Sequence, residues 1–91
     1  MTAGWELRTS PKFDQAIQKF DRSVARAVIG VLEDVAATGD PRVRGRALSG
    51  DRRWYWRYRV DDYRVIANID DAGLLLVALD VGHRSAIYRR R

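Results

Sequence analysis

The segment from residue 52 to residue 71, RRWYWRYRVDDYRVIANIDD, constrains the fold of this chain more than any other. Two runs rich in aromatic and β-branched residues flank Asp61 and Asp62. Such runs around a two-residue connection indicate a β-hairpin. With these two aspartates as the loop, Val60 pairs with Tyr63, so the sequence predicts two antiparallel strands in a defined register.

Alternation along the two strands separates their side chains into two faces. One face is entirely aromatic or aliphatic and is expected to pack against helices; it consists of Trp54, Trp56, Tyr58, Val60, Tyr63, Val65, Ala67 and Ile69. The other face consists of Tyr55, Arg57, Arg59, Arg64, Ile66 and Asn68. A slip of one residue in either strand would mix the two sets, so the pattern supports the register.

The predicted register places Arg59 directly opposite Arg64, with Arg57 one step along the same face. Like charges in opposite positions destabilise a sheet by a few tenths to about 1 kcal/mol. One interpretation is an anion site, in which guanidiniums on a rigid sheet bind a phosphate and Tyr55 stacks on a base. The alternative is a set of solvated arginines whose aliphatic stems shield the sheet.

The N-terminal half predicts a strand and two helices. Residues 5–9, WELRT, alternate apolar and polar side chains, which indicates a short strand. Ser10 and Pro11 are typical of an N-cap and a first helical position, and Phe13, Ile17 and Phe20 follow at helical spacing. A second helix is expected from about residue 22 to 37. Its apolar stripe consists of Val24, Val28, Val31, Leu32 and Val35.

Residues 42–52 are basic and are expected to be irregular. After the hairpin, residues 74–81, LLLVALDV, show little alternation and predict a strand that is central or covered on both faces. The expected order is β-α-α-β-β-β. This order predicts a single α+β domain over residues 1–91, with a small, mostly antiparallel sheet packed on an N-terminal helical hairpin.

The charge of the chain favours an anionic partner. Seventeen Lys and Arg residues face twelve Asp and Glu, which gives a formal net charge of +5. Nearly all of the positive charge is arginine, which binds phosphate through two parallel hydrogen bonds. The alternative explanation is the preference for arginine over lysine that is typical of high-GC genomes.

Composition also limits the other possibilities. The chain has no cysteine and one histidine, which excludes a disulfide framework and makes a zinc site implausible. No secretory signal is visible, and no apolar run approaches the roughly 18 residues of a membrane span. A cytoplasmic protein without a cysteine- or zinc-based metal site is therefore expected.

The tail after Gly82 carries three further candidates, His83, Arg84 and Tyr88. Histidine exchanges protons near neutral pH, so His83 is a candidate acid or base. No Ser–His–Asp arrangement is recognisable, and a lone histidine near a strand end is more often a surface or packing residue. Tyr88 fits either the core or a catalytic site.

Residues 47–90 resemble the RelE branch of the RelE/ParE toxin superfamily of bacterial type II toxin–antitoxin systems. The matching pieces are the LSG motif, the WRYRVDDYRVI hairpin and the VGHRSAIY ending. The resemblance implies a RelE-like fold and an endoribonuclease, without metal or nucleotide cofactor, that cleaves mRNA in the A site of the 70S ribosome. In such enzymes the ribose 2′-hydroxyl attacks the adjacent phosphate, which leaves a 2′,3′-cyclic phosphate and a 5′-hydroxyl. It also implies a cognate antitoxin and a toxin–antitoxin hetero-oligomer.

The resemblance assigns roles to individual residues. The catalytic set that it implies is Arg57, Arg59, Arg64, Arg84 and Tyr88. Arg64 and Arg84 are expected to stabilise the pentacoordinate phosphate, and Tyr88 to act as the base. Arg84 or another cation would assist the leaving 5′-oxygen, and His83 is a candidate acid by analogy with relatives. Further RNA contacts are expected from Arg46, Arg53, Tyr55 and His83.

The chain departs from the best-known RelE branch in three places. Arg57 and Arg59 replace lysines, and because arginine does not readily release a proton, a lysine-mediated step needs another residue. Arg84 and Tyr88 are closer together, and no helix is expected before the chain stops at Arg91. Two other functions stay open: a ParE-like toxin that inhibits DNA gyrase, and a non-catalytic basic RNA-binding module.

Overall fold

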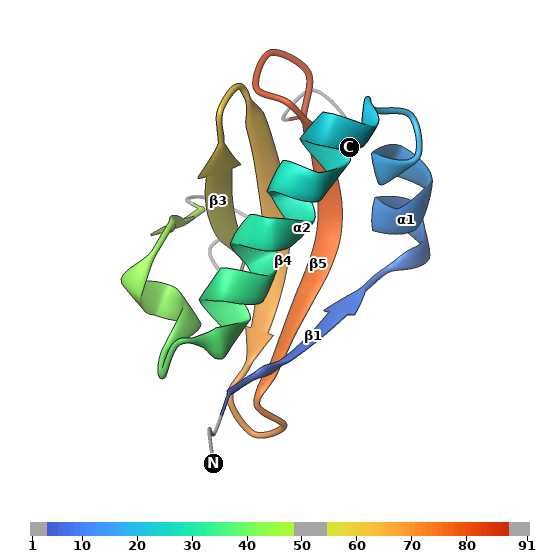
Figure 1. Ribbon diagram of the computed structural model, residues 1–91. Helices are drawn as coiled ribbons and strands as arrows, with labels where there is room; N and C mark the ends of the chain where they lie inside the picture. The colour runs from blue at the N-terminus through green and yellow to red at the C-terminus, as the bar shows by residue number, and fades with distance from the viewer. Residues whose placement is uncertain (1–3, 49–54, 88–91) are drawn as a thin grey trace.

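The computed structural model describes residues 4–48 and 55–87, which form a five-stranded sheet and two α-helices (Figure 1). The strands are β1 (Glu6–Thr9), β2 (Arg46–Ala47), β3 (Trp56–Val60), β4 (Tyr63–Asp70) and β5 (Leu75–His83). The helices are α1 (Pro11–Ile17) and α2 (Arg22–Ala37), and a short 3₁₀ helix, η1, covers Pro41–Val43. The predicted α+β class is confirmed.

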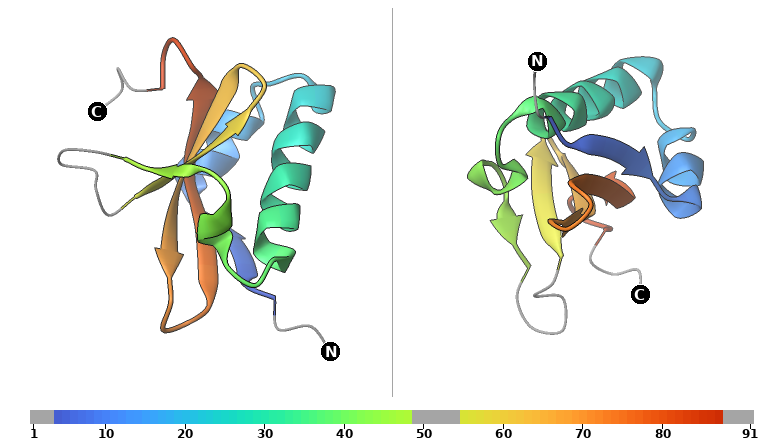
Figure 2. Two further views of the ribbon diagram at one scale, coloured as in Figure 1. Left: turned by 90° about the vertical axis from the view of Figure 1, so that its left-hand side faces the viewer. Right: turned by 90° about the horizontal axis from the view of Figure 1, so that it is seen from below.

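The strand order across the sheet is β1-β5-β4-β3-β2. β1 runs parallel to β5, and the other neighbours are antiparallel, as the expected mostly antiparallel sheet requires. Helix α2 lies across one side of the sheet, and the chain after β5 turns toward the opposite side (Figure 2). Among the described residues, no helix therefore covers the strand side chains on the side of the sheet opposite α2.

The hairpin has the predicted register. Val60 pairs with Tyr63, and Arg59 pairs with Arg64. Asp61 adopts a φ of +53°, the left-handed conformation that Asp tolerates better than most residues in a tight turn. The predicted apolar face packs into the core, where Tyr58 and Val65 are almost completely buried.

The helices form from local signals that the sequence carries. The Ser10 hydroxyl accepts a hydrogen bond from the backbone N–H of Phe13 at 3.1 Å, which confirms the predicted N-cap. Helix α1 ends at Ile17, so Phe20 lies in the connection and packs against Tyr63 with ring centroids 4.9 Å apart. Helix α2 has the predicted bounds and buries one stripe, which consists of Val28, Leu32, Val35 and Ala36.

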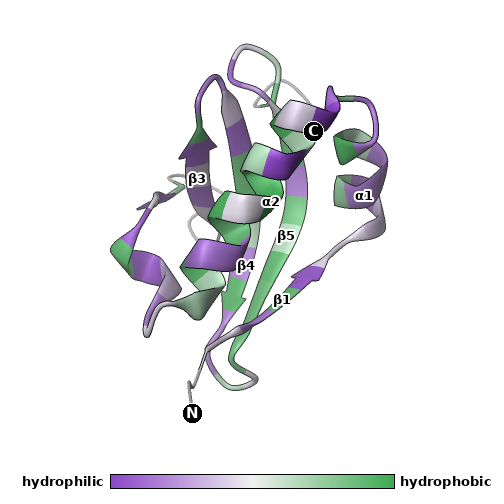
Figure 3. Cartoon of the chain, in the orientation of Figure 1, coloured by the Kyte–Doolittle hydropathy of each residue, from purple (hydrophilic) through white to green (hydrophobic). Residues whose placement is uncertain are grey.

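One expectation was wrong, because residues 42–52 are not irregular throughout. They include the end of η1 and the strand β2, which pairs Arg46 with Arg57 and Ala47 with Trp56. By contrast, β5 has the predicted interior place between β1 and β4, and it is hydrophobic over most of its length (Figure 3). None of the helices in the described residues combines the length and apolar character that crossing a membrane requires.

Candidate functional site

The side of the sheet opposite α2 carries Arg57, Arg59, Arg64 and Ile66, and we call it the arginine face. Their neighbours in the strands, Tyr58, Val60, Val65 and Ala67, belong to the buried core on the other side. The predicted separation of arginines from core residues is therefore confirmed. The arginines on this face nevertheless differ in exposure and in partners.

Arg64 uses its guanidinium inside the protein. Only 8% of the residue is exposed, and its Nη1 donates hydrogen bonds to the backbone carbonyls of Asp61 and Tyr63, each at 3.0 Å. This arrangement directs the charge of Arg64 to the β3–β4 turn, which relieves its repulsion with Arg59 in the opposite position. In this conformation Arg64 stabilises the hairpin.

Arg84 lies at the same turn. Its backbone N–H donates to the carbonyl of Asp62 at 2.7 Å, and its Nε lies 3.8 Å from a carboxylate oxygen of Asp62. Both side chains are well exposed, so the ion pair contributes little to stability. Arg84 therefore sits near Arg64 but has a carboxylate partner, whereas Arg64 has carbonyl partners.

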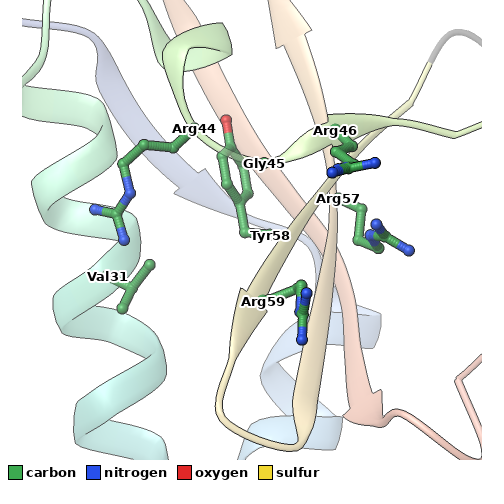
Figure 4. Close-up of a pocket in the computed structure, with 7 residues that line it drawn as sticks. All are labelled: Val31, Arg44, Gly45, Arg46, Arg57, Tyr58 and Arg59. Carbon is green, nitrogen blue, oxygen red and sulfur yellow. The ribbon is translucent and has the colours of Figure 1, made fainter.

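A pocket of about 190 Å³ lies at the β2–β3 edge of the sheet. Its lining residues are Val31, Arg44, Gly45, Arg46, Arg57, Tyr58 and Arg59. Figure 4 shows Arg44 extending toward α2, whereas Arg46 and Arg57 extend on the other side of β3. Cationic groups thus border this edge on both sides.

Three arginines of the pocket, Arg44, Arg46 and Arg59, are exposed, and we call them the edge arginines. They form no ion pair with any carboxylate in residues 4–48 and 55–87. Elsewhere Arg8 pairs with Glu6, and Arg42 makes a bidentate contact with Asp71 at 2.8 and 2.9 Å. Positive charge that no carboxylate of the described residues pairs with therefore gathers at the β2–β3 edge, which suits an anionic ligand.

The chain between η1 and β2 is held rigidly against β3. The indole N–H of Trp56 donates to the carbonyl of Arg44 at 2.6 Å, and the Tyr58 hydroxyl donates to the carbonyl of Pro41 at 2.8 Å. Burial raises the pKa of the Tyr58 phenol, so this hydroxyl remains a donor at neutral pH. Gly45, which lies between Arg44 and Arg46, adopts a φ of +77°, a conformation that favours glycine. These contacts preorganise the backbone that carries two edge arginines.

His83 lies apart from this group. It pairs with Tyr63 across β4 and β5, and the two rings meet edge to face with centroids 5.7 Å apart, on the side that faces the helices. Its Nδ1 accepts a hydrogen bond from the backbone N–H of Ser85 at 3.2 Å. The structure therefore places His83 on the opposite side of the sheet from Arg57 and Arg59.

The remaining predicted residues divide into two groups. Tyr55 is 39% exposed beside β3, and Arg46 is exposed on β2 directly opposite Arg57. Arg53 and Tyr88 lie outside the described residues, as does Trp54 of the predicted apolar face. The sequence analysis did not single out Arg44, which lies in the basic segment 42–52 that it expected to be irregular.

Comparisons with known proteins agree with this architecture. Residues 7–88 match the family model described as ParE toxin of type II toxin–antitoxin system, parDE. No curated protein sequence matches the chain significantly.

Among solved structures, the chain is similar to one in the RelBE2 toxin–antitoxin complex from Mycobacterium tuberculosis. The TM-score is 0.81 at 23% identity, with 93% of this chain and 95% of that chain covered. A mutant of the Escherichia coli toxin RelE in the free state gives 0.77 at 17%, covering 93% and 88%. The archaeal RelE–RelB complex from Pyrococcus horikoshii gives 0.71 at 18%, covering 91% and 98%.

The structural likeness establishes the fold, and the family model covers most of the chain. This protein belongs to the ParE toxin family, within the RelE/ParE superfamily of type II toxin–antitoxin toxins.

Proposed function

We propose that this toxin is a ribosome-dependent endoribonuclease that cleaves mRNA in the A site. The observation that supports the proposal is the gathering of the edge arginines, without carboxylate partners among the described residues, beside Arg57. Cleavage by the 2′-hydroxyl needs stabilisation of a phosphate that gains negative charge. Fixed cations next to a rigid sheet supply that stabilisation.

In the proposed reaction the 2′-oxygen attacks the adjacent phosphorus and the bond to the 5′-oxygen breaks. Arg57 and Arg59 contact the phosphate that gains charge, and Arg46 binds a flanking phosphate. Tyr55, exposed on the same side, stacks on a base. Tyr88 is the candidate base, and Arg64 and Arg84 join the phosphate contacts if the bound RNA draws them from the turn.

The direct test adds purified toxin to translating ribosomes and maps mRNA ends by primer extension. We expect cuts within the A-site codon and a 2′,3′-cyclic phosphate on the upstream product. Arg59→Gln is expected to lower the cleavage rate about 100-fold, the usual effect of losing one group that stabilises transition-state charge. Arg26→Gln is the matched control, because it removes the same charge from an exposed position on α2. Equal loss in both variants would show that only net charge matters.

The partner that we propose is a cognate antitoxin, in a hetero-oligomer in the cytoplasm. The similar structures include toxin–antitoxin complexes from a bacterium and an archaeon. An antitoxin segment rich in Asp and Glu would match the edge arginines in charge. Co-expression with the adjacent gene, followed by purification through a tag on one chain, tests this.

A second candidate function, inhibition of DNA gyrase, is favoured by the family model, which describes ParE toxins. A supercoiling assay with purified gyrase separates the two: inhibition without any mRNA cut supports the ParE-like activity. RNA binding without either effect would instead support the non-catalytic module, with an affinity that falls steeply with salt.

A further inference from the structure

A β-bulge interrupts the pairing of β4 with β5 close to the arginine face. Ile66 pairs with Asp80, but the next residue of β4, Ala67, pairs with Ala78, so Leu79 is an extra residue in β5. Bulges change the direction of a side chain and are common beside functional sites. Here the bulge immediately precedes an acidic residue, Asp80.

The start of helix α1 is attached to this bulge. The backbone N–H of Ser10 donates to the carbonyl of Ala78 at 2.9 Å, and the Ser10 hydroxyl donates to the carbonyl of Leu79 at 2.8 Å. The same hydroxyl oxygen accepts the N-cap bond from Phe13. The first turn of α1, which carries Lys12, is therefore fixed beside Asp80.

Asp80 belongs to the arginine face although it is only 6% exposed. It pairs with Ile66, which pairs with Arg57, which pairs with Arg46 on β2. One Asp80 oxygen accepts from the backbone N–H of Val81 at 2.9 Å, and the other lies 3.6 Å from Lys12 Nζ. The lysine side chain is 61% exposed, so its ammonium group is anchored yet open to solvent.

The Lys12–Asp80 pair supplies an exchangeable proton, which Arg57 and Arg46 on the paired strands lack. The leaving 5′-oxygen needs a proton, and arginine does not release one, whereas the lysine ammonium does. His83 faces the other side of the sheet. Adjacent strands are about 4.8 Å apart, so Arg57 and Asp80, two strands apart, are separated by about 10 Å, and long side chains from both ends reach a phosphate between them.

We infer that Lys12 is the general acid of the cleavage reaction and that Asp80 is its positioning residue; this role rests on the proposed endoribonuclease function. The 2′-oxygen forms a bond to phosphorus, and its proton passes to the base, for which Tyr88 is the candidate. The bond between phosphorus and the 5′-oxygen breaks as Lys12 transfers a proton from Nζ to that oxygen. Both groups then return to their starting forms through water, which gives a proton to the Lys12 amine and takes one from the protonated base.

The test compares Lys12→Arg with wild type on ribosome-bound mRNA. Arginine keeps the charge but not the exchangeable proton, so we expect kcat to fall about 100-fold, the scale of a general acid, with KM changed less than about threefold. Lys19→Arg is the matched control at the other lysine of the chain and should cleave like wild type. Wild-type cleavage by Lys12→Arg would overturn the assignment.

A second substrate separates proton donation from other effects. An mRNA with sulfur as the bridging 5′ atom at the scissile position has a thiolate leaving group, which needs no proton because thiols have a pKa of about 8.5. Lys12→Arg should cleave this RNA within about threefold of wild type. An equal defect on both RNAs would refute the acid role, and a wild-type protein that cuts neither RNA would overturn the proposed function itself.

Asp80→Asn tests the positioning role without changing the size of the side chain. It should lower kcat about 10-fold on the oxygen substrate, and the double variant with Lys12→Arg should be no slower than Lys12→Arg alone. A circular dichroism melt of each variant shows that it is folded at the assay temperature. Additive losses in the double variant would mean that Asp80 acts separately from Lys12.

Discussion

Gly45→Ala should destabilise this toxin more than any ordinary surface substitution. A methyl group at this position would lie 2.2 Å from the Arg57 carbonyl oxygen and 2.8 Å from both Trp56 Nε1 and Tyr58 Cδ1. The φ of +77° is also a conformation that alanine adopts only at a cost of about 1–2 kcal/mol. The Arg57 oxygen belongs to the backbone of β3, so the segment around Gly45 must move instead.

That movement breaks the contacts that hold the segment. The Trp56–Arg44 and Tyr58–Pro41 hydrogen bonds contribute about 1 kcal/mol each, and the buried Tyr58 hydroxyl is then left without a partner. When the cost of the positive φ is added to these losses, the free energy of unfolding should fall by about 3–5 kcal/mol. Proteins of this size have about 5–14 kcal/mol of stability, so the loss is a large fraction of the total.

Urea unfolding followed by tryptophan fluorescence measures the effect, and a loss of this size lowers the midpoint by about 2 M. Gly39→Ala is the matched control, because no atom lies within 4 Å of the added methyl group and its φ is not positive. Its midpoint should stay within about 0.3 M of wild type. A Gly45→Ala midpoint inside the same range would refute the claim that this glycine keeps Arg44 and Arg46 in place.

Three further outcomes are expected. Gly30→Ala, inside α2 with open space around it, should raise stability by about 0.5–1 kcal/mol and increase the Tm in calorimetry; an unchanged or lower Tm would contradict this. The hydrogen bond from Arg42 lowers the pKa of Asp71 below 3.8, so this carboxylate adds stability above that pH and loses it as pH falls through the lowered value; Arg42→Gln should raise its NMR titration midpoint, and an unmoved midpoint would refute the contact. Burial raises the pKa of Tyr58 above 10.0, so its contribution is full below that pH and is lost as pH rises further. Tyr58→Phe should lower the free energy of unfolding by about 1 kcal/mol at pH 7 and reduce the fall of the urea midpoint at alkaline pH. An unchanged alkaline fall in this variant would show that another group causes it.

The sequence predicted the hairpin because its information is local. A two-residue loop fixes the pairing, and strict alternation then assigns each side chain between Tyr55 and Asn68 to one face or the other. Strand β2 was not predicted, because two residues, Arg46 and Ala47, carry no periodic pattern. Its position depends on two carbonyl acceptors, Pro41 in η1 and Arg44 just after it, and on donors from β3 that lie 17 and 12 positions away in the chain.

The hydrogen-bond and ion-pair partners of the charged groups could not be predicted from the sequence either. Arg64 donates hydrogen bonds to backbone carbonyls. Every residue has a backbone carbonyl, so no pattern of side chains predicts this contact. The bulge at Leu79 is hidden within a continuous apolar run, and its consequence, a buried Asp80 beside Lys12, depends on a helix from the other end of the chain. The pattern of charges thus predicted which face is basic, but not which of its arginines are available to bind an anion.

In the proposed cleavage reaction, the hydrogen bonds of Arg64 at the turn decide how it contacts RNA. To contact a phosphate it must leave two carbonyl acceptors, each worth about 0.5–1.5 kcal/mol net, so the released form costs about 1–3 kcal/mol and is populated about 5–150-fold less. One charge-assisted bond to phosphate contributes a similar amount, about 1.5–3 kcal/mol. RNA that binds only the edge arginines leaves Arg64 at the turn, whereas RNA that also contacts Arg64 offsets the cost of its release. In the proposed reaction, the guanidinium of Arg64 therefore adds to the charge around the scissile phosphate only when bound RNA contacts it.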